Sequence, residues 1–563
     1  MKLSYISKLR NLSLLSVTVS MLFACGGNSN ESSTTGWQLN EEENGGFEAV
    51  TDYLEQETGP GLVFIEGGTF TMGRVQDDVM HDWNNTPKKL HVRSFYMDET
   101  EVTNVSYREY LHWLKLVFPP SEDQYKYIHE SALPDTLVWR NRLGANEVFV
   151  DNYLRHPAYN YYPVVGVNWI QATKYADWRT DRVNEKILMD YGILRDDIYK
   201  MKKDGGTEAI IYGEAHFTTE RYLKEPNSVF GDNKDVFGKG LPDISPNRDT
   251  KPDDGGFQGR HVVMEDGILL PKYRLPTEAE WEFSALALKG NREFNTIKGG
   301  KKFPWNGKTA KSQERRTKGD LLANFKAGRG DYKGIAGWSN DGADITNQVK
   351  SYPPNDYGLY DMAGNVSEWV ADVYRPVIDD NANDFSYYRG NVFTRDSVDL
   401  DGQIVTVTDD AIVYDTLSNG KLVPRALPGD IAKVKVNDED TYMRPNYNKA
   451  NNINYDDGDK ESSADYAMDY SDNPEDKKEM YNSPKFKYTT DEEGKPKYDT
   501  NKRTSLINDK VRVYKGGSWA DRVYWLDPAQ RRYLQQDMSS NSIGFRCAMD
   551  RVGSQVVDDK SAY

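Results

Sequence analysis

The apolar and polar positions in the first third of the chain predict short strands followed by a helix. Leu62–Ile65 and Thr69–Gly73 are apolar runs broken by a glycine pair at 67–68, a pattern that favours paired strands. His91–Met97 alternates in the same way. In Asn104–Val117 the apolar residues recur every three or four positions, so we expect an amphipathic helix there.

Two further helices are predicted later in the chain. Pro163–Val167 is typical of a strand, and it leads through Asn168 into an amphipathic helix over Trp169–Trp178. Thr277 is followed three residues later by Glu280, which is the spacing of a capping box at a helix N-terminus. The apolar face of that second helix would use Trp281, Phe283, Ala285 and Leu288.

Two long segments do not follow these patterns. Residues 179–272 are rich in Gly, Asp, Asn and Lys, and residues 375–508 are richer still in acidic side chains. Within the second segment, acidic residues and tyrosines crowd together at Tyr455, Asp456, Asp457, Asp459, Glu461, Asp465, Tyr466, Asp469 and Tyr470. Such segments are solvated loops, partly disordered stretches or partner-facing extensions, and the sequence leaves these alternatives open.

Composition narrows the protein class. Of 563 residues, 37% are apolar and 12% aromatic, which is enough for a packed core. The net charge of −17 disfavours binding to nucleic acid, because an acidic surface repels phosphate. With only Cys25 and Cys547, the chain holds neither a disulfide framework nor a zinc site of several thiolates.

The N-terminus has the pattern of an export signal. Positive residues precede the short apolar stretch Leu12–Phe23, which is too short for a typical membrane span. The signal ends in Leu-Phe-Ala-Cys, which resembles a bacterial lipobox, and the polar run Gly26–Gly36 follows like a tether. We therefore expect Cys25 to be lipidated and to hold the protein to a membrane. The alternative is an ordinary secretory signal in which Cys25 is incidental.

Seven sequence blocks, in order, resemble the formylglycine-generating enzyme (sulfatase-modifying factor) family. They are Gly61–Gly73, Asp98–Asn104, Pro163–Trp178, Arg274–Glu282, Gly358–Trp369, Lys515–Trp519 and Gly544–Cys547. The resemblance implies a single α+β domain with a C-type-lectin-like fold, low in regular secondary structure.

The expected domain organisation follows from these blocks and the segments between them. It comprises a signal peptide (1–24), a tether and lead-in (25–60), a first part of the family domain (61–374, with the insertion 179–272), an acidic tyrosine-rich insertion (375–508), the C-terminal part of the domain (509–550) and a tail (551–563).

The resemblance also bears on catalysis. Enzymes of this family hold copper with two cysteines, which lie two and seven residues after the aromatic residue of the Gly-Gly-Ser-aromatic block. Counted from Trp519, those positions are Asp521 and Leu526, and neither supplies the soft thiolate that Cu(I) needs. We therefore expect no copper, no catalytic residues of this type and no formylglycine-forming activity. The neighbouring Arg531 and Arg532 would either line a cleft or form ion pairs.

Calcium is expected instead, because the family binds it structurally at two sites. The matching positions of the first site are Asn324 and Asp341, with the carbonyls of Phe325 and Ala343. Those of the second are Asp361 and Glu368, with the carbonyls of Gly364 and Val366. Carboxylates and carbonyls together meet the preference of calcium for hard oxygen ligands. The alternative is that Glu368 caps a turn and the aspartates face water.

The wider arrangement, including Met80–Pro87 and the insertions, resembles gliding-motility lipoproteins of Bacteroidetes. That resemblance implies a non-catalytic scaffold subunit at the outer membrane, facing the periplasm. Its partners would be gliding and type IX secretion components, including a GldK-like relative. Two alternatives remain at this stage: an enzyme with altered chemistry in the old pocket, and a lectin-like binder of glycan or peptidoglycan.

Overall fold

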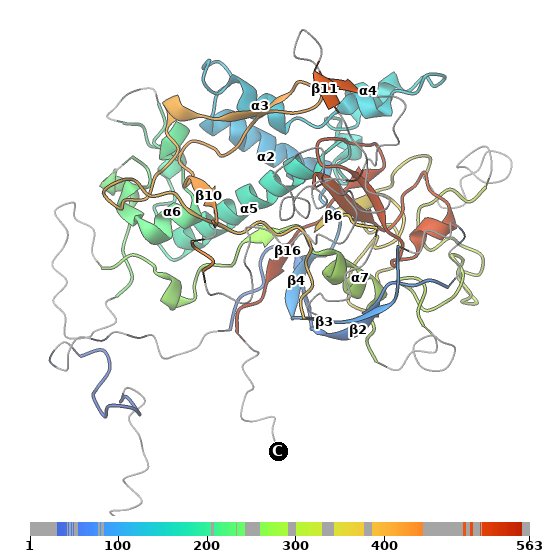
Figure 1. The fold of residues 1–563 in the computed structure, drawn as a ribbon, viewed down its shortest axis with the longest axis horizontal. Helices are drawn as coiled ribbons and strands as arrows, with labels where there is room; N and C mark the ends of the chain where they lie inside the picture. The colour runs from blue at the N-terminus through green and yellow to red at the C-terminus, as the bar shows by residue number, and fades with distance from the viewer. Residues whose placement is uncertain are drawn as a thin grey trace, which may run out of the picture.

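The computed structural model describes most of the chain between residues 31 and 553. The residues outside the description are 1–30, 42, 44–46, 48, 50–54, 77–78, 80–83, 204–205, 207, 232, 243–258, 291–299, 329–342, 377–384, 438, 443–487, 491–495, 499–506, 508 and 554–563. Cys25, residues 80–83 of Met80–Pro87 and the acidic run at 455–470 therefore lie outside the described residues. In Figure 1, most helices gather on the left of the view, and most strands lie to the right and below.

Three of the described helices begin where the sequence predicts, at Asn104, at Trp169 and directly after Thr277. The bounds of the described helices are α2 (Asn104–Val117), α3 (Lys126–Ala132), α4 (Glu147–Asn152), α5 (Trp169–Asp190), α6 (Thr219–Lys224) and α7 (Glu278–Leu286). The predictions for Asn104–Val117 and for the Thr277–Glu280 capping box are confirmed, since Thr277 and Glu280 bond each other's backbone N–H groups. One detail is wrong: α7 ends at Leu286, so Leu288 lies beyond the helix and is exposed.

The first sheet joins the two ends of the domain. Its order is β1 (Leu62–Ile65), β4 (Phe95–Asp98), β16 (Ala548–Asp550) and β5 (Tyr273–Arg274), all antiparallel. Strand β16 near the C-terminus therefore sits between strands from the first half of the chain. Most of these strand residues are buried, so the sheet forms part of the core.

The second sheet carries the C-terminal motif blocks. Its order is β14 (Arg532–Gln535), β13 (Val511–Lys515), β6 (Ser367–Val373) and β15 (Ile543–Gly544). The pairings are antiparallel except for β15 with β6, and a register shift lies between Arg512 and Tyr514. Every residue of β6 is buried, which places the motif around Glu368 inside the molecule.

Four two-stranded ribbons complete the strands of the described residues. They pair β2 (Gly68–Met72) with β3 (Lys88–Val92), β7 (Thr394–Asp396) with β10 (Lys433–Lys435), β8 (Tyr414–Thr416) with β9 (Leu422–Pro424), and β11 (Tyr488–Thr490) with β12 (Pro496–Tyr498). A mixture of helices with mostly antiparallel sheets agrees with the predicted α+β class.

Two strand predictions are wrong. The runs Leu62–Ile65 and Thr69–Gly73 do form strands, but they pair with β4 and β3 respectively and not with each other. Pro163–Val167 is not a strand. Its backbone instead makes single bonds to separate segments: Val164 N–H donates to the Val102 carbonyl, and Gly166 N–H donates to the Ser540 carbonyl. The apolar residues of this segment are buried in the core, but the segment does not pair with a neighbouring strand.

The described residues of 179–272 are packed into the molecule to a degree that the sequence did not predict. Helix α5 runs twelve residues past the predicted end at Trp178, to Asp190, after a capping box between Asn168 and Gln171. Apolar residues of the segment join the largest hydrophobic core, among them Leu188, Ile198, Phe217, Tyr222 and Phe230. Composition alone did not predict this packing, because polar residues are the majority in the segment although enough apolar residues are present to enter the core.

Residues 385–442, the described first part of the predicted acidic insertion, form a strap over the helices. Figure 1 shows it running past α3, α5 and α6. The Tyr414 hydroxyl donates to the Gln124 carbonyl at 2.8 Å, and Lys174 of α5 donates to the Pro424 carbonyl at 2.7 Å. The Lys421 ammonium donates to the Leu133 carbonyl at 3.1 Å. This part of the insertion is bound along the domain surface.

Among the described residues, no helix combines the length and apolar character that crossing a bilayer requires.

Candidate functional site

The loop after β13 carries residues 521 and 526, the two positions at which the resemblance places copper-binding cysteines. Gly517 has a φ of 69°, and a Cβ at that position would lie 2.7 Å from the Trp525 carbonyl oxygen. Only glycine therefore allows the loop to fold back on itself here. The turn brings Ser518 and Asp521 to one side and leads into a short 3-10 helix, Val523–Leu526.

Asp521 is held in an ion pair. Its two carboxylate oxygens accept hydrogen bonds from the two terminal nitrogens of Arg532, each at 2.7 Å. The Ser518 hydroxyl donates to the same carboxylate at 2.6 Å. Both charged side chains are only 18% exposed. Such a bidentate pair fixes the geometry of both groups, so the ion-pair alternative for Arg532 describes this structure.

Arg532 is confined on all sides. Its guanidinium lies between the rings of Tyr514 and Trp525, at 4.8 and 4.7 Å from their centroids. It also donates to the Ser367 hydroxyl at 2.7 Å. These contacts leave the guanidinium little freedom to release Asp521 to a ligand.

Leu526 fills the second position with hydrocarbon. It is fully buried in a small core that includes Phe303, Ala323, Phe325 and Ala363. A neutral ion pair and a buried leucine provide neither a nucleophile nor a soft metal ligand. The two positions that the resemblance assigns to the thiolates thus hold an ion-paired carboxylate and a packed leucine.

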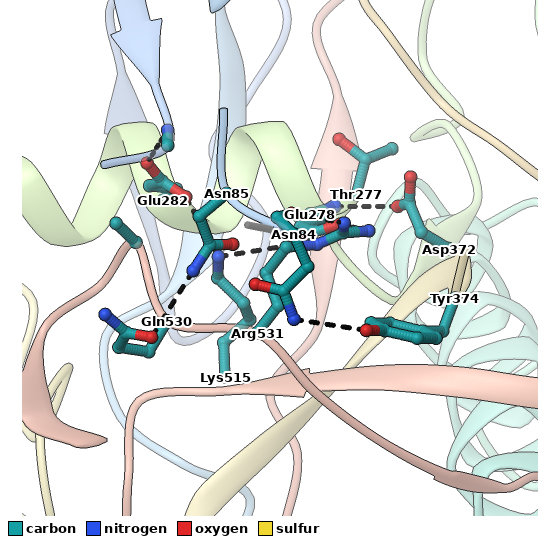
Figure 2. Close-up of polar contacts among 12 residues, drawn as sticks. Asn84, Asn85, Thr277, Glu278, Glu282, Asp372, Tyr374, Lys515, Gln530 and Arg531 are labelled. Carbon is teal, nitrogen blue, oxygen red and sulfur yellow. Dashed lines mark hydrogen bonds and ion pairs between the residues drawn. The ribbon is translucent and has the colours of Figure 1, made fainter. Parts of the chain in front are cut away.

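A buried charge cluster holds the motif blocks together next to this loop (Figure 2). Lys515, at the end of β13, donates to Glu282 at 2.9 Å and to Glu278 at 3.3 Å. Arg531 makes a bidentate contact with Glu278 at 2.6 and 3.0 Å. Burial opposes ionisation, but Arg531 and Lys515 hold the pKa of Glu278 below its usual value. Arg531 is thus held in an ion pair, and it also lines a small cavity of ≈ 20 Å³ beside β2 and β3.

Asp372 lies at the edge of the same cluster and accepts hydrogen bonds only from backbone among its recorded contacts (Figure 2). The donors are the N–H groups of Glu278, at 2.7 Å, and Arg389, at 3.1 Å. Burial raises the pKa of Asp372 to about 7, and the nearby Glu278 carboxylate adds to the effect. This aspartate is a structural acid that pins the start of α7.

The predicted second calcium loop turns inward as expected. Asp361 and Asn365 have φ values of 56° and 57°, and Gly364 has one of 80°. A Cβ on Gly364 would lie 2.4 Å from the Asn324 carbonyl oxygen, and Asn365 N–H donates to that same oxygen at 2.8 Å. The loops of the two predicted calcium sites are therefore in direct contact.

One oxygen in this loop has no protein partner. Asp361 Oδ2 accepts from the Lys350 N–H at 3.0 Å, whereas its Oδ1 is buried without any hydrogen bond. Burial raises the pKa of Asp361 to about 6. A buried carboxylate oxygen without a donor is costly unless a cation or proton meets it, so Asp361 fits the role of a calcium ligand.

Glu368 is less available than the sequence suggested. Its oxygens accept from Arg546 at 2.6 and 2.7 Å, and from the indole N–H of Trp281 at 2.7 Å. All three side chains are buried. The ligand role of Glu368 stays a prediction, and its geometry shows that it also anchors the last motif block to β6.

Glu101 is the residue that sequence reasoning missed. It is 1% exposed, and its carboxylate accepts from the Asn365 side chain at 2.9 Å and from the Val366 N–H at 3.2 Å. Burial raises the pKa of Glu101 well above its usual value, and the charges of Asp361 and Glu368 raise it further. It lies between Thr100 and Val102 in the Asp98–Asn104 block, and its neighbours in the sequence gave no signal of its burial.

Acidic groups outnumber basic ones around this loop. Glu101, Asp361 and Glu368 place three buried carboxylates near one buried guanidinium, that of Arg546. A divalent cation would offset the excess and supply the missing contact to Asp361. The side chains and carbonyls of this loop therefore fit calcium in chemical type, although no cluster of three His, Cys, Asp or Glu with metal-binding geometry occurs in the described part of the chain.

The first predicted calcium site is described in part. The Asn324 side chain is buried and donates to the Ile345 carbonyl at 2.8 Å and to the Asn365 side chain at 3.3 Å. Phe325 and Ala343 are buried nearby in sequence, whereas Asp341 lies outside the described residues. This site remains a prediction.

Cys547 is a structural thiol. It is fully buried, and burial raises the pKa of its thiol above the usual value. Its backbone N–H donates to Asp98 at 2.8 Å. An inert, enclosed thiol of this kind cannot replace an exposed catalytic pair.

Comparison with known proteins agrees with the motif blocks. The family model described as a sulfatase-modifying factor enzyme 1-like domain matches residues 48–406 and 472–551. The formylglycine-generating enzyme of Mus musculus is 24% identical over 344 residues, which cover 58% of this chain and 65% of that protein. The inactive C-alpha-formylglycine-generating enzyme 2 of Bos taurus is 36% identical over 103 residues, 18% of this chain and 27% of that protein. This chain thus spans less than two thirds of these relatives.

Solved structures match more weakly. PvdO from Pseudomonas aeruginosa is 14% identical with a TM-score of 0.37, and the match covers 88% of this chain and 100% of that one. The Treponema denticola variable protein 1 is 14% identical with a TM-score of 0.32, covering 88% and 98%. The assignment rests on the family model, which matches well over half of the sequence: the chain belongs to the sulfatase-modifying factor enzyme 1-like family.

Proposed function

We propose that this protein is a non-catalytic scaffold subunit of the gliding motility and type IX secretion machinery. The observation that carries the non-catalytic part is the pairing of Asp521 with Arg532 beside a buried Leu526, at the positions where family enzymes hold copper. A satisfied ion pair and a packed leucine replace both thiolates. Relatives named as inactive, in Bos taurus and Mus musculus, are consistent with loss of catalysis in this family.

The cellular role rests on the resemblance to the gliding-motility lipoprotein GldJ. In this proposal a lipid on Cys25 anchors the protein in the outer membrane, with the domain facing the periplasm. The strap 385–442 and the tyrosine-rich residues beyond it then present surface to partner subunits, including a GldK-like relative, since tyrosine is favoured at interfaces.

Calcium has a structural role in this proposal. Asp361, with the carbonyls of Gly364 and Val366, would hold the ion, and Glu101 and Glu368 would lie beside it. Bound calcium supplies positive charge to a loop whose carboxylates exceed its cations. No step of a reaction depends on it.

Two variants test the anchor. Cys25→Ser should move the protein from the membrane fraction to the soluble fraction, because the acylated thiol is lost. The matched control, Cys547→Ser, changes the only other cysteine and should leave the protein in the membrane fraction. Membrane association that survives Cys25→Ser would contradict the anchor.

Crosslinking of the native lipoprotein in its own membrane tests the scaffold role. We expect gliding or type IX secretion components among the crosslinked proteins, and their absence would contradict the proposal. A separate assay tests the catalytic half: the purified chain, supplied with copper and oxygen, should not oxidise a cysteine-containing peptide. Turnover in that assay would establish the altered-enzyme alternative.

A further inference from the structure

A cavity lies apart from the loop that carries Asp521 and from the loops of the two predicted calcium sites. It has a volume of ≈ 400 Å³ and opens between β3, the starts of α5 and α7, and residues 386–391. None of its lining residues belongs to the sites described above. Its size is within the range of sites that take small organic molecules.

Three aromatic side chains, Trp169, Tyr387 and Tyr388, form part of the lining. Trp169 is fixed in place, because its indole N–H donates to the Val370 carbonyl at 2.8 Å and the Arg512 guanidinium lies 3.8 Å from its ring centroid. A ring whose polar atom is satisfied and whose position is set offers flat apolar surface to a ligand at little entropic cost.

A fixed polar array faces the same space. Arg274 is clamped between Glu280, at 2.7 Å to each oxygen, and Asp550, at 2.6 Å. Arg93, also in the lining, lies 3.8 Å from Asp550. Two guanidinium groups and two carboxylates leave the lining with no net charge. The cavity therefore offers alternating donors and acceptors but no excess charge to attract an ion.

Ser386 contributes a polar atom that lacks a partner. Its backbone N–H donates to the His91 carbonyl at 2.7 Å, and its φ of 47° is unusual for a residue other than glycine. The Ser386 hydroxyl is buried and makes no hydrogen bond within the protein, and Ser386 is part of the cavity lining. A hydroxyl of this kind is satisfied when a ligand brings its own polar group.

We propose that this cavity binds a neutral saccharide. A sugar ring presents an apolar face that matches Trp169, Tyr387 and Tyr388, and its hydroxyls both donate and accept, as the array around Arg274 requires. The neutral lining disfavours phosphorylated and strongly charged ligands, which would need an unmatched charge opposite them. The site would let the protein contact envelope glycan while it serves as a scaffold, and it does not depend on that scaffold role.

The test is a binding experiment on the full chain. The probes are N,N′-diacetylchitobiose and maltose as neutral sugars, with sialyllactose as the charged comparator. Saturation-transfer NMR and tryptophan fluorescence should report binding of at least one neutral sugar, and the charged comparator should bind about tenfold more weakly or not at all. Binding of sialyllactose alone, or of no sugar, would overturn the proposal.

Two variants locate the binding. Thr173→Phe places a ring into the cavity from the exposed side of α5 and should weaken sugar binding by about tenfold or more. Ser386→Ala removes the unpartnered hydroxyl and should weaken it less. The matched control is Val105→Phe, an exposed position on α2 outside the lining, which should leave binding unchanged. Thermal unfolding of each variant shows whether it folds, and unchanged binding by a folded Thr173→Phe protein would refute the site.

Discussion

Asp521 and Asp361 each lie in a loop with little access to water, but they differ in the groups that meet their carboxylates. Asp521 meets one guanidinium in a bidentate pair and leaves no recorded charge unmatched. Asp361 has a buried oxygen without a donor, and it shares its surroundings with Glu101 and Glu368 against a single Arg546. At the position where a copper ligand was expected, the protein supplies its own counter-charge. At the position where we propose calcium, acidic groups outnumber basic ones, and a cation would offset the difference.

The largest effect is expected from removing the one cation of the calcium loop. Arg546→Met leaves Glu368 buried without its bidentate partner, so it should cost about 3–5 kcal/mol of unfolding free energy in calcium-free buffer. Chemical denaturation measures this cost. If the loop is a cation site, added calcium should recover part of the loss. A variant as stable as the wild type would show that Glu368 does not need Arg546.

Calcium itself should have the next largest effect. At about a hundredfold excess over its dissociation constant, calcium should stabilise the wild-type protein by about 3 kcal/mol, seen as a rise in Tm that chelation reverses. Asp361→Asn should abolish most of this response, whereas Asp521→Asn should leave it intact. An equal response in both variants would erase the contrast between the two loops.

Loss of the ion pair between Asp521 and Arg532 should lower the unfolding free energy less, because this pair is partly exposed. Arg532→Met should cost about 1–2 kcal/mol, since it strands Asp521 at a site that water still reaches. The double variant Arg532→Met with Asp521→Leu removes both charges and should be more stable than the single variant. A double variant less stable than the single one would mean that the pair contributes more than mutual neutralisation.

Asp372 gives the most specific prediction, a pH dependence. Its pKa is raised by burial from 3.8 to about 7, so between these values the folded state binds a proton that the unfolded state does not. Stability from this group is therefore highest at low pH and is lost as pH rises through about 7. Asp372→Asn mimics the protonated acid, and it should flatten the difference in unfolding free energy between pH 5 and pH 8 by about 2 kcal/mol.

Denaturation of both proteins at the two pH values provides the comparison. Buried acids away from Asp372 should titrate alike in the wild type and in Asp372→Asn, so the difference between the two proteins reports Asp372 together with its neighbour Glu278. If the variant keeps the wild-type pH dependence, Asp372 does not titrate near neutrality.

Local signals in the sequence predicted local structure well. The helix at Asn104–Val117 and the capping box of Thr277 with Glu280 both depend on residues within a few positions of one another, and both are present. Strand partners depend on the whole fold, which is why Leu62–Ile65 was assigned to the wrong neighbour. For residues 179–272 the sequence left loops, partly disordered stretches and partner-facing extensions open, because the composition of the segment hides the apolar residues that enter the core.

The same contrast between local and long-range information applies to the candidate site. Residue identity alone predicted that Asp521 and Leu526 hold no copper. It did not predict which group Asp521 would meet, because Arg532 reaches it only once β14 has folded beside β13. Glu101 was missed because its importance comes from burial beside Asp361, which is 260 positions later in the numbering.

The first sheet has a consequence for how this protein is made. Strand β16 lies between β4 and β5, and Cys547 next to it bonds Asp98, which is 449 residues earlier. A ribosome must therefore pass residue 550 before this inner strand of the sheet is complete. Contacts of such long range slow folding, because a large loop must close first. A stop codon before residue 548 would thus remove a central strand, and the truncated product should be a target for proteolysis rather than a shortened, working protein.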